Sequence, residues 1–191
     1  MTSIDLRRKN SLNLFREAPK LGAFDEFPVL RPDVDPQLHV SRGGVDQPFH
    51  LICAKDSVVA LVSGCARVDF ASGAVRHFDM EPGDFVYVPA GIPHRIHVLE
   101  AGIQLRYKAR EAGLEAVAWM CAGCGTEIGR HVWDTASTLP QEGYLAACGR
   151  FNESDEARRC PKCGEVHAAV DLTHFRWAAV AAALRDDAAP N

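Results

Sequence analysis

Four of the seven cysteines form two pairs whose spacing suits a metal ion. In each pair two residues separate the cysteines and a glycine follows at once; the pairs are Cys121 with Cys124 and Cys160 with Cys163. A tight turn between such cysteines aims both sulfurs at one point, and the glycine accepts the backbone angles that follow the turn. Two pairs complete a tetrahedral shell of four sulfurs, which suits zinc or a single iron ion.

A shell of four protein sulfurs leaves no coordination position for a substrate. We therefore predict that these cysteines hold a structural metal. A redox pair or simple buried cysteines would explain one such pair, but two pairs with trailing glycines favour the metal. The other cysteines are expected to be small apolar residues without a partner; they are Cys53, Cys65 and Cys148.

The composition is that of an ordinary folded protein. The chain has 191 residues, of which 47% are hydrophobic and 24% charged, so it can build a packed core. The formal net charge of −4 argues against nucleic acid as the main partner. A zinc-ribbon contact with nucleic acid, through the basic residues beside the second cysteine pair, is therefore the weaker alternative. Because no signal peptide or long apolar run is present, we expect a cytosolic protein with no membrane partner.

Short strand-like runs separated by turn signals occupy the middle of the chain. We expect strands over 56–62, 65–70, 75–78, 85–88, 95–98 and 103–108, with a turn at 63–64. This pattern is typical of an all-β barrel of the jelly-roll kind. We divide the chain into an N-terminal arm (1–36) with a short helix, a barrel (37–110), a metal-binding extension with few long strands (111–170), and a C-terminal helix and tail (171–191) capped by Asp171 or Thr173.

Residues 83–98 carry a fixed spacing of glycine, proline and histidine. The order is glycine, five residues, proline, one residue, glycine, two residues and histidine, here Gly83, Pro89, Gly91 and His94. This resembles the second signature motif of the cupin superfamily, and implies a barrel with His94 pointing into its mouth. The first cupin motif is eroded: His50 follows Gly44 at the right interval and Asp56 stands where an acid is expected, but Gly64 comes one residue late.

The motifs and the cysteine pairs together resemble one cupin family, the bacterial 3-hydroxyanthranilate 3,4-dioxygenases. The resemblance covers about residues 40–167, and is strongest in segments 118–125 (AWMCAGCG) and 158–167 (RRCPKCGEVH). It implies a cupin barrel followed by a rubredoxin-like site with iron or zinc on the four cysteines. It also implies a homodimer.

The same resemblance implies a catalytic iron(II) in the barrel. Its ligands would be His50, Asp56 and His94, a set of two histidines and a carboxylate that leaves positions open for an aromatic substrate and oxygen. His97 is a possible alternative ligand, and His77 is expected to lie at the surface or in the core. The arginines that grip the substrate carboxylate in that family are missing, since Val45–Phe49 and Val98 stand in their places, so we expect a substrate other than 3-hydroxyanthranilate.

Two functions follow from these observations. The first, which the intact second motif and the spacing of His50 and Asp56 favour, is a mononuclear non-haem metal dioxygenase-like enzyme that acts on a small aromatic or heteroaromatic compound. The second is a non-catalytic cupin that binds a small molecule or a partner and holds only the structural metal.

Overall fold

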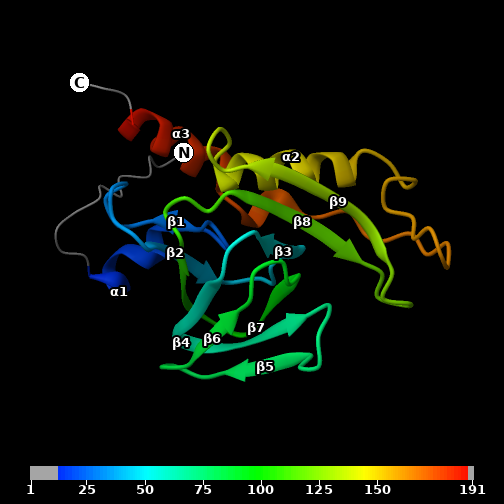
Figure 1. Ribbon diagram of the computed structural model, residues 1–191, viewed down its shortest axis with the longest axis horizontal. Helices are drawn as coiled ribbons and strands as arrows, with labels where there is room; N and C mark the ends of the chain where they lie inside the picture. Colours follow the sequence, from blue (N-terminus) through cyan, green and yellow to red (C-terminus); the bar gives the residue numbers. More distant parts are fainter. Residues whose placement is uncertain (1–12, 189–191) are drawn as a thin grey trace.

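The computed structural model describes residues 13–188 and is built around one curled, antiparallel, nine-stranded sheet (Figure 1). Its strands are β1 (Phe27–Pro28), β2 (Gln37–Gly43), β3 (His50–Cys53), β4 (Ser57–Phe70), β5 (His77–Met80), β6 (Phe85–Val88), β7 (His94–Lys108), β8 (Leu114–Met120) and β9 (Glu127–Asp134). The helices are α1 (Leu14–Glu17), α2 (Pro140–Asn152) and α3 (Trp177–Ala188), with 3-10 turns at Ala18–Lys20 and Leu172–His174. The predicted mainly β fold and its terminal helix are confirmed, and the sheet curls into a half-barrel.

The long strands β4 and β7 pair along almost their whole length and form the bend of the barrel. The turn predicted at Ser63–Gly64 is wrong: register shifts between Leu61 and Ala66 make a bulge inside one continuous strand. A Cβ on Gly102 of β7 would lie 1.8 Å from the Ser63 carbonyl oxygen, so the two strands bend together where neither has room for a side chain. The separate strands predicted over 95–98 and 103–108 are likewise one strand, β7.

The sheet continues into the segment that follows the barrel strands. β8 pairs with β3, and β9 pairs with β8, so the two strands of segment 111–170 extend the sheet of the barrel. The division of the chain into a barrel (37–110) and an extension (111–170) stays a prediction. Figure 1 shows α2 lying along the β8–β9 hairpin, and α3 packs against α2.

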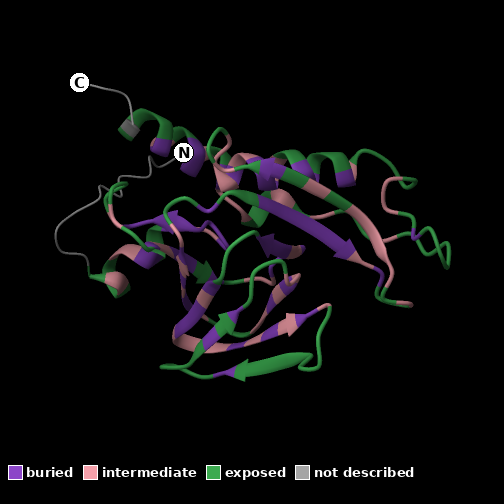
Figure 2. Ribbon diagram, viewed as in Figure 1, coloured by how far each residue is buried: buried purple, intermediate pink, exposed green. Residues whose placement is uncertain are grey.

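One aromatic core joins the barrel to these helices. Phe49, directly before β3, lies with its ring centroid 5.1 Å from that of Tyr144 of α2 and 6.0 Å from that of Trp177 of α3, and all three side chains are buried. Figure 2 shows β8 buried along most of its length, whereas β5 on the opposite side is exposed except for Met80. The core therefore lies between the barrel and the helices.

The C-terminal helix begins later than predicted. Asp171 caps the 3-10 turn at Leu172–His174 by accepting from the Thr173 amide, and α3 starts only at Trp177, whose side chain is fully buried. Among residues 13–188, no helix has the length and apolar character needed to cross a bilayer. The cytosolic location stays a prediction.

Candidate functional sites

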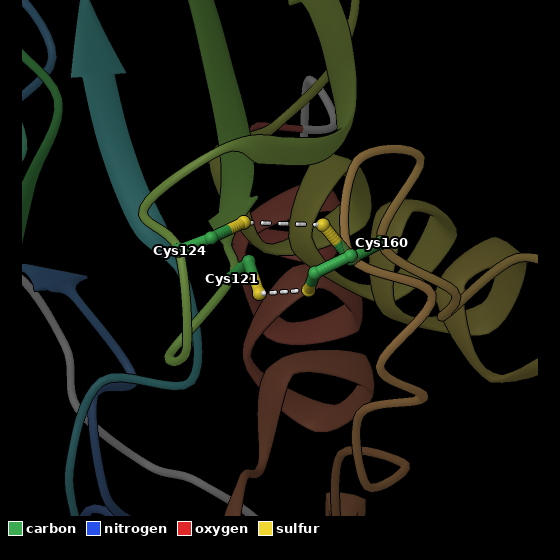
Figure 3. A group of neighbouring side chains, drawn as sticks. Cys121, Cys124 and Cys160 are labelled. Carbon is green, nitrogen blue, oxygen red and sulfur yellow. Dashed lines mark hydrogen bonds between the residues drawn. The ribbon is translucent and has the colours of Figure 1, made fainter.

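The four paired cysteines meet at the outer end of the β8–β9 hairpin. Cys121 and Cys124 lie in the turn between these strands, and Cys160 and Cys163 lie in the loop that follows α2. The sulfurs of Cys124 and Cys160 are 3.5 Å apart, as are those of Cys121 and Cys163 (Figure 3). This spacing is far from the ~2 Å of a disulfide and near the ~3.8 Å edge of a tetrahedral shell with bonds of about 2.3 Å.

The two turns that carry the cysteine pairs, Cys121–Gly125 and Cys160–Gly164, are called knuckles below. They have the same backbone geometry. In the first, the Cys121 amide donates to the Thr126 carbonyl at 2.8 Å and the Gly125 amide donates to the Cys121 carbonyl at 2.8 Å. In the second, the matching bonds join Cys160, Glu165 and Gly164 at 2.8 and 3.0 Å. Both glycines have positive φ, as the predicted turn requires.

The surroundings of Cys124 favour the thiolate that a metal needs. Hydrogen bonds from the hydroxyl and the amide of Thr126 lower the pKa of the Cys124 thiol to about 6. All four sulfurs lie within 4.8 Å of one another, so the donor set fits a single zinc or iron ion.

The three predicted barrel ligands are not brought together. Leu51 of β3 lies directly opposite His94 of β7, and residues directly opposite share a face of the sheet. Because successive side chains alternate, His50 points to the other face. Asp56 precedes β4, is exposed, and accepts a hydrogen bond from the Ala90 amide at 2.8 Å. Within residues 13–188 these three do not form a set of mutually near donor atoms.

His94 is fully buried and its metal-binding nitrogen is already in use. Nδ1 lies 3.2 Å from the Ile92 carbonyl oxygen, which fixes the proton on that nitrogen, and Nε2 accepts from Nη1 of Arg106 at 2.6 Å. Burial, and next the positive charge of Arg106, hold the pKa of His94 well below its usual value. An iron ion therefore does not fit at His94 in this arrangement.

Ion pairs fill the barrel interior around Arg106. Arg106 Nε lies 2.6 Å from Glu26 Oε1, and Lys108 Nζ lies 2.5 Å from Glu115 Oε1 and 3.4 Å from Glu26 Oε2. Tyr144 donates to Glu26 Oε2 at 2.5 Å. All five side chains are buried, and two cations face two carboxylates, while Nη2 of Arg106 and Oε2 of Glu115 have no hydrogen-bond partner.

Glu26 enters this network from the N-terminal arm in a strained conformation. Its φ is +46°, which costs about 1–3 kcal/mol for a residue other than glycine. Gln141 of α2 donates to the carbonyls of Asp25 and Glu26, which holds the segment over the barrel end. Sequence reasoning missed Glu26, Arg106 and Lys108, because nothing local marks a charged residue as buried.

A cleft of about 480 Å³ lies on the other face, where the barrel meets the cysteine-bearing loop. His50 and Arg95 line it from the barrel, Trp119 from β8, and His167 and Phe175 from the C-terminal segment. Burial, and next the charge of Arg95, lower the pKa of His50 to about 4, so its ring is neutral at pH 7.

The remaining predicted side chains lie apart from any metal set. His97 is held between Asp46 and Asp69, at 2.6 and 2.9 Å, and His77 is exposed on β5. Cys53 and Cys148 are buried, and burial raises the pKa of each thiol to about 12, which keeps both inert.

The fold and the cysteine cluster define a curled β-sheet protein with a four-sulfur site that could hold a metal. The chain is 30% identical over 111 residues to a 3-hydroxyanthranilate 3,4-dioxygenase from Cupriavidus pinatubonensis, covering 52% of this chain and 54% of that protein. The predicted resemblance is thus confirmed, although the chain spans about half the length of the curated relatives it matches.

Solved structures give more distant matches. A hydroquinone 1,2-dioxygenase from Sphingomonas sp. TTNP3 is 14% identical with a TM-score of 0.41, covering 50% of this chain and 71% of that chain. A cupin-2 domain protein from Shewanella frigidimarina is 14% identical with a TM-score of 0.40, covering 46% and 81%. No family model matches the sequence.

Proposed function

We propose that this chain is a cupin that binds a small aromatic molecule and carries its structural metal on the four cysteines. The proposal is carried by one contact: Arg106 donates to Nε2 of His94, the nitrogen that a barrel metal would need. The similarity to relatives named as dioxygenases of an aromatic compound supports an aromatic ligand.

The guanidinium of Arg106 beside His94 decides whether the barrel interior can hold a metal or a ligand. The cation is held by Glu26 at 2.6 Å and buried beside the ring of Phe24, and its departure would leave Glu26 with only Lys108, at 3.4 Å, and Tyr144 as partners. The two cations and two carboxylates of the network balance one another's charge in the barrel interior. The ligand is therefore expected outside the ion-paired interior.

The second candidate is an iron(II)-dependent, ring-cleaving dioxygenase that acts on a small aromatic compound with oxygen. The specific observation in its favour is the sequence similarity to 3-hydroxyanthranilate 3,4-dioxygenases. This function requires the hydrogen bond between Arg106 and His94 to break. It also requires the side chains of His50 and Asp56 to turn towards His94.

Metal content separates the two candidates. The protein would be purified without oxygen, resupplied with iron(II), and analysed for metals per chain, together with a His50→Ala/His94→Ala variant and a Cys121→Ser/Cys124→Ser variant. We expect one metal in the parent and in the histidine variant, and none in the cysteine variant. Oxygen uptake with catechols and aminophenols should be absent. Two metals in the parent, one in the histidine variant, and oxygen uptake would contradict the binding function and support the dioxygenase.

We also propose a homodimer that forms through the outer face of the barrel. An apolar groove of about 450 Å³ lies there, and four of its side chains are between 45 and 66% exposed: Val75, Phe78, Phe85 and Tyr87. Large apolar residues gathered in this way are typical of an interface.

A further inference from the structure

We infer that the cleft between the barrel edge and the cysteine-bearing loop binds a planar aromatic carboxylate. This rests on the proposed binding function and adds the site and the ligand class. The cleft lies on the face of β3 and β7 that carries His50 and Arg95, away from the ion-paired interior. Its volume of about 480 Å³ suits a small organic molecule.

Three nitrogen atoms of residues that line the cleft are buried and have no hydrogen-bond partner. They are Nδ1 of His50, Nε1 of Trp119 and Nε2 of His167. An unpaired buried polar atom costs about 1–3 kcal/mol, so such atoms are normally satisfied by water or a ligand. The indole nitrogen can only donate, and it therefore requires an acceptor.

Arg95 supplies the positive charge for a carboxylate. Its Nε donates to the Gln47 carbonyl at 2.7 Å, which fixes the side chain, while Nη2 stays 3.8 Å from Asp46, beyond a good hydrogen bond. The side chain is 33% exposed, so the outer guanidinium nitrogens remain accessible. A guanidinium fork matches a carboxylate with two parallel hydrogen bonds.

The acids near the cleft are already engaged. Asp46 contacts His97 at 2.6 Å and accepts from the Val98 amide at 2.8 Å. Asp171 accepts from the amide and the hydroxyl of Thr173 at 2.9 and 2.7 Å. Both aspartates line the cleft and keep their charge, but their hydrogen-bond partners are already in place, and Arg95 is the arginine of the lining that is left to contact the ligand.

Aromatic side chains provide the walls for a flat ring. Trp119 stacks on Phe151 with centroids 4.2 Å apart and planes 7° apart, and Phe175 stacks on Trp177 at 4.3 Å and 11°. Because each lining ring is held by a second ring, both walls are rigid, and a planar ligand ring gains stacking without ordering side chains.

The test is calorimetric titration of the metal-loaded protein with salicylate and with its neutral analogue 2-hydroxybenzamide. The variants are Arg95→Gln, Arg95→Lys, Trp119→Phe, and Arg67→Gln as a matched arginine on an exposed surface. We expect salicylate to bind Arg95→Gln at least about ten-fold more weakly than the parent, Arg95→Lys in between, and Arg67→Gln like the parent. Trp119→Phe, which keeps a ring but lacks the donor, should weaken binding several-fold.

The outcomes distinguish the site from the function. If salicylate binds the parent and all four variants equally, the ligand lies elsewhere; the cleft is then refuted and the binding function stands. If neither compound, nor phenol or catechol, binds the folded parent, the proposed function fails together with the cleft. Thermal melting of each variant separates weak binding from misfolding.

Discussion

Arg106 and His94 are joined by a hydrogen bond of 2.6 Å inside the barrel, with the guanidinium donating to Nε2 of the imidazole. The same guanidinium pairs with Glu26 at 2.6 Å, so a strand of the barrel, a histidine of the cupin motif and the N-terminal arm meet at one cation. Gly83 and Gly91 of the motif both have positive φ, as its turns require, while the histidine of the motif belongs to a buried polar network.

Removing Arg106 should be far more damaging than removing an exposed arginine. Arg106→Met leaves the buried Glu26 carboxylate short of a partner, and we expect a loss of about 3–5 kcal/mol in the free energy of unfolding, measured in urea. Arg67→Met, which breaks the exposed pair with Asp79, should cost no more than about 1 kcal/mol. The double variant Glu26→Gln/Arg106→Met should recover part of the loss; equal losses for both arginines would contradict a buried ion-pair network.

Acid should destabilise the protein from about pH 6.5 downwards because His94 is buried and neutral. Its folded pKa lies well below the unfolded value of about 6.5, so only the unfolded chain takes up the proton as the pH falls. Stability is therefore complete above pH 6.5 and is lost below it. His94→Gln keeps a donor for Ile92 and an acceptor for Arg106 but cannot titrate. Its unfolding free energy, measured with zinc in excess between pH 7.5 and 5, should fall less steeply than that of the parent; identical slopes would show that His94 does not contribute.

Loss of the metal should unfold the cysteine-bearing end. Cys160→Ser removes one of four sulfurs, and we expect it to lower the metal content and the melting temperature together. Cys148→Ser replaces a buried cysteine outside the cluster, and its metal content should equal that of the parent. A strong chelator should lower the melting temperature of the parent and have little effect on Cys160→Ser.

The shared bend of β4 and β7 should tolerate no side chain at Gly102. A Cβ there would lie 1.8 Å from the Ser63 carbonyl oxygen, so Gly102→Ala must push the strands apart, and we expect a loss of more than about 2 kcal/mol. Gly44→Ala is the control, since a Cβ at Gly44 meets nothing within 4 Å. Chemical denaturation of both variants tests this, and similar midpoints would refute the steric argument.

The oligomeric state should respond to charge in the outer groove. Phe85 is 66% exposed within the apolar groove, and Phe85→Glu should convert a dimer into a monomer in light-scattering chromatography. Leu99→Glu changes a residue of similar exposure, 62%, outside the groove and should leave the dimer intact. A parent that is already monomeric at high concentration would end the homodimer proposal.

The sequence alone determined the features that depend on short-range spacing. The two cysteine knuckles were predictable because two intervening residues and a glycine dictate a local turn, and the positive φ of Gly125 and Gly164 follows from it. The strand over Phe85–Val88 and the turn before it were predictable for the same reason.

Tertiary structure decided which face each side chain takes and which charges are buried. His50 and His94 are both placed by motif spacing, yet the pairing of Leu51 with His94 turns His50 to the opposite face. A shift of one residue reverses every side chain of a strand, because their orientation repeats with period two, and that register is set by strand pairing over long sequence distances. Glu26 and Arg106 are 80 residues apart in the chain, so only the folded barrel makes them partners.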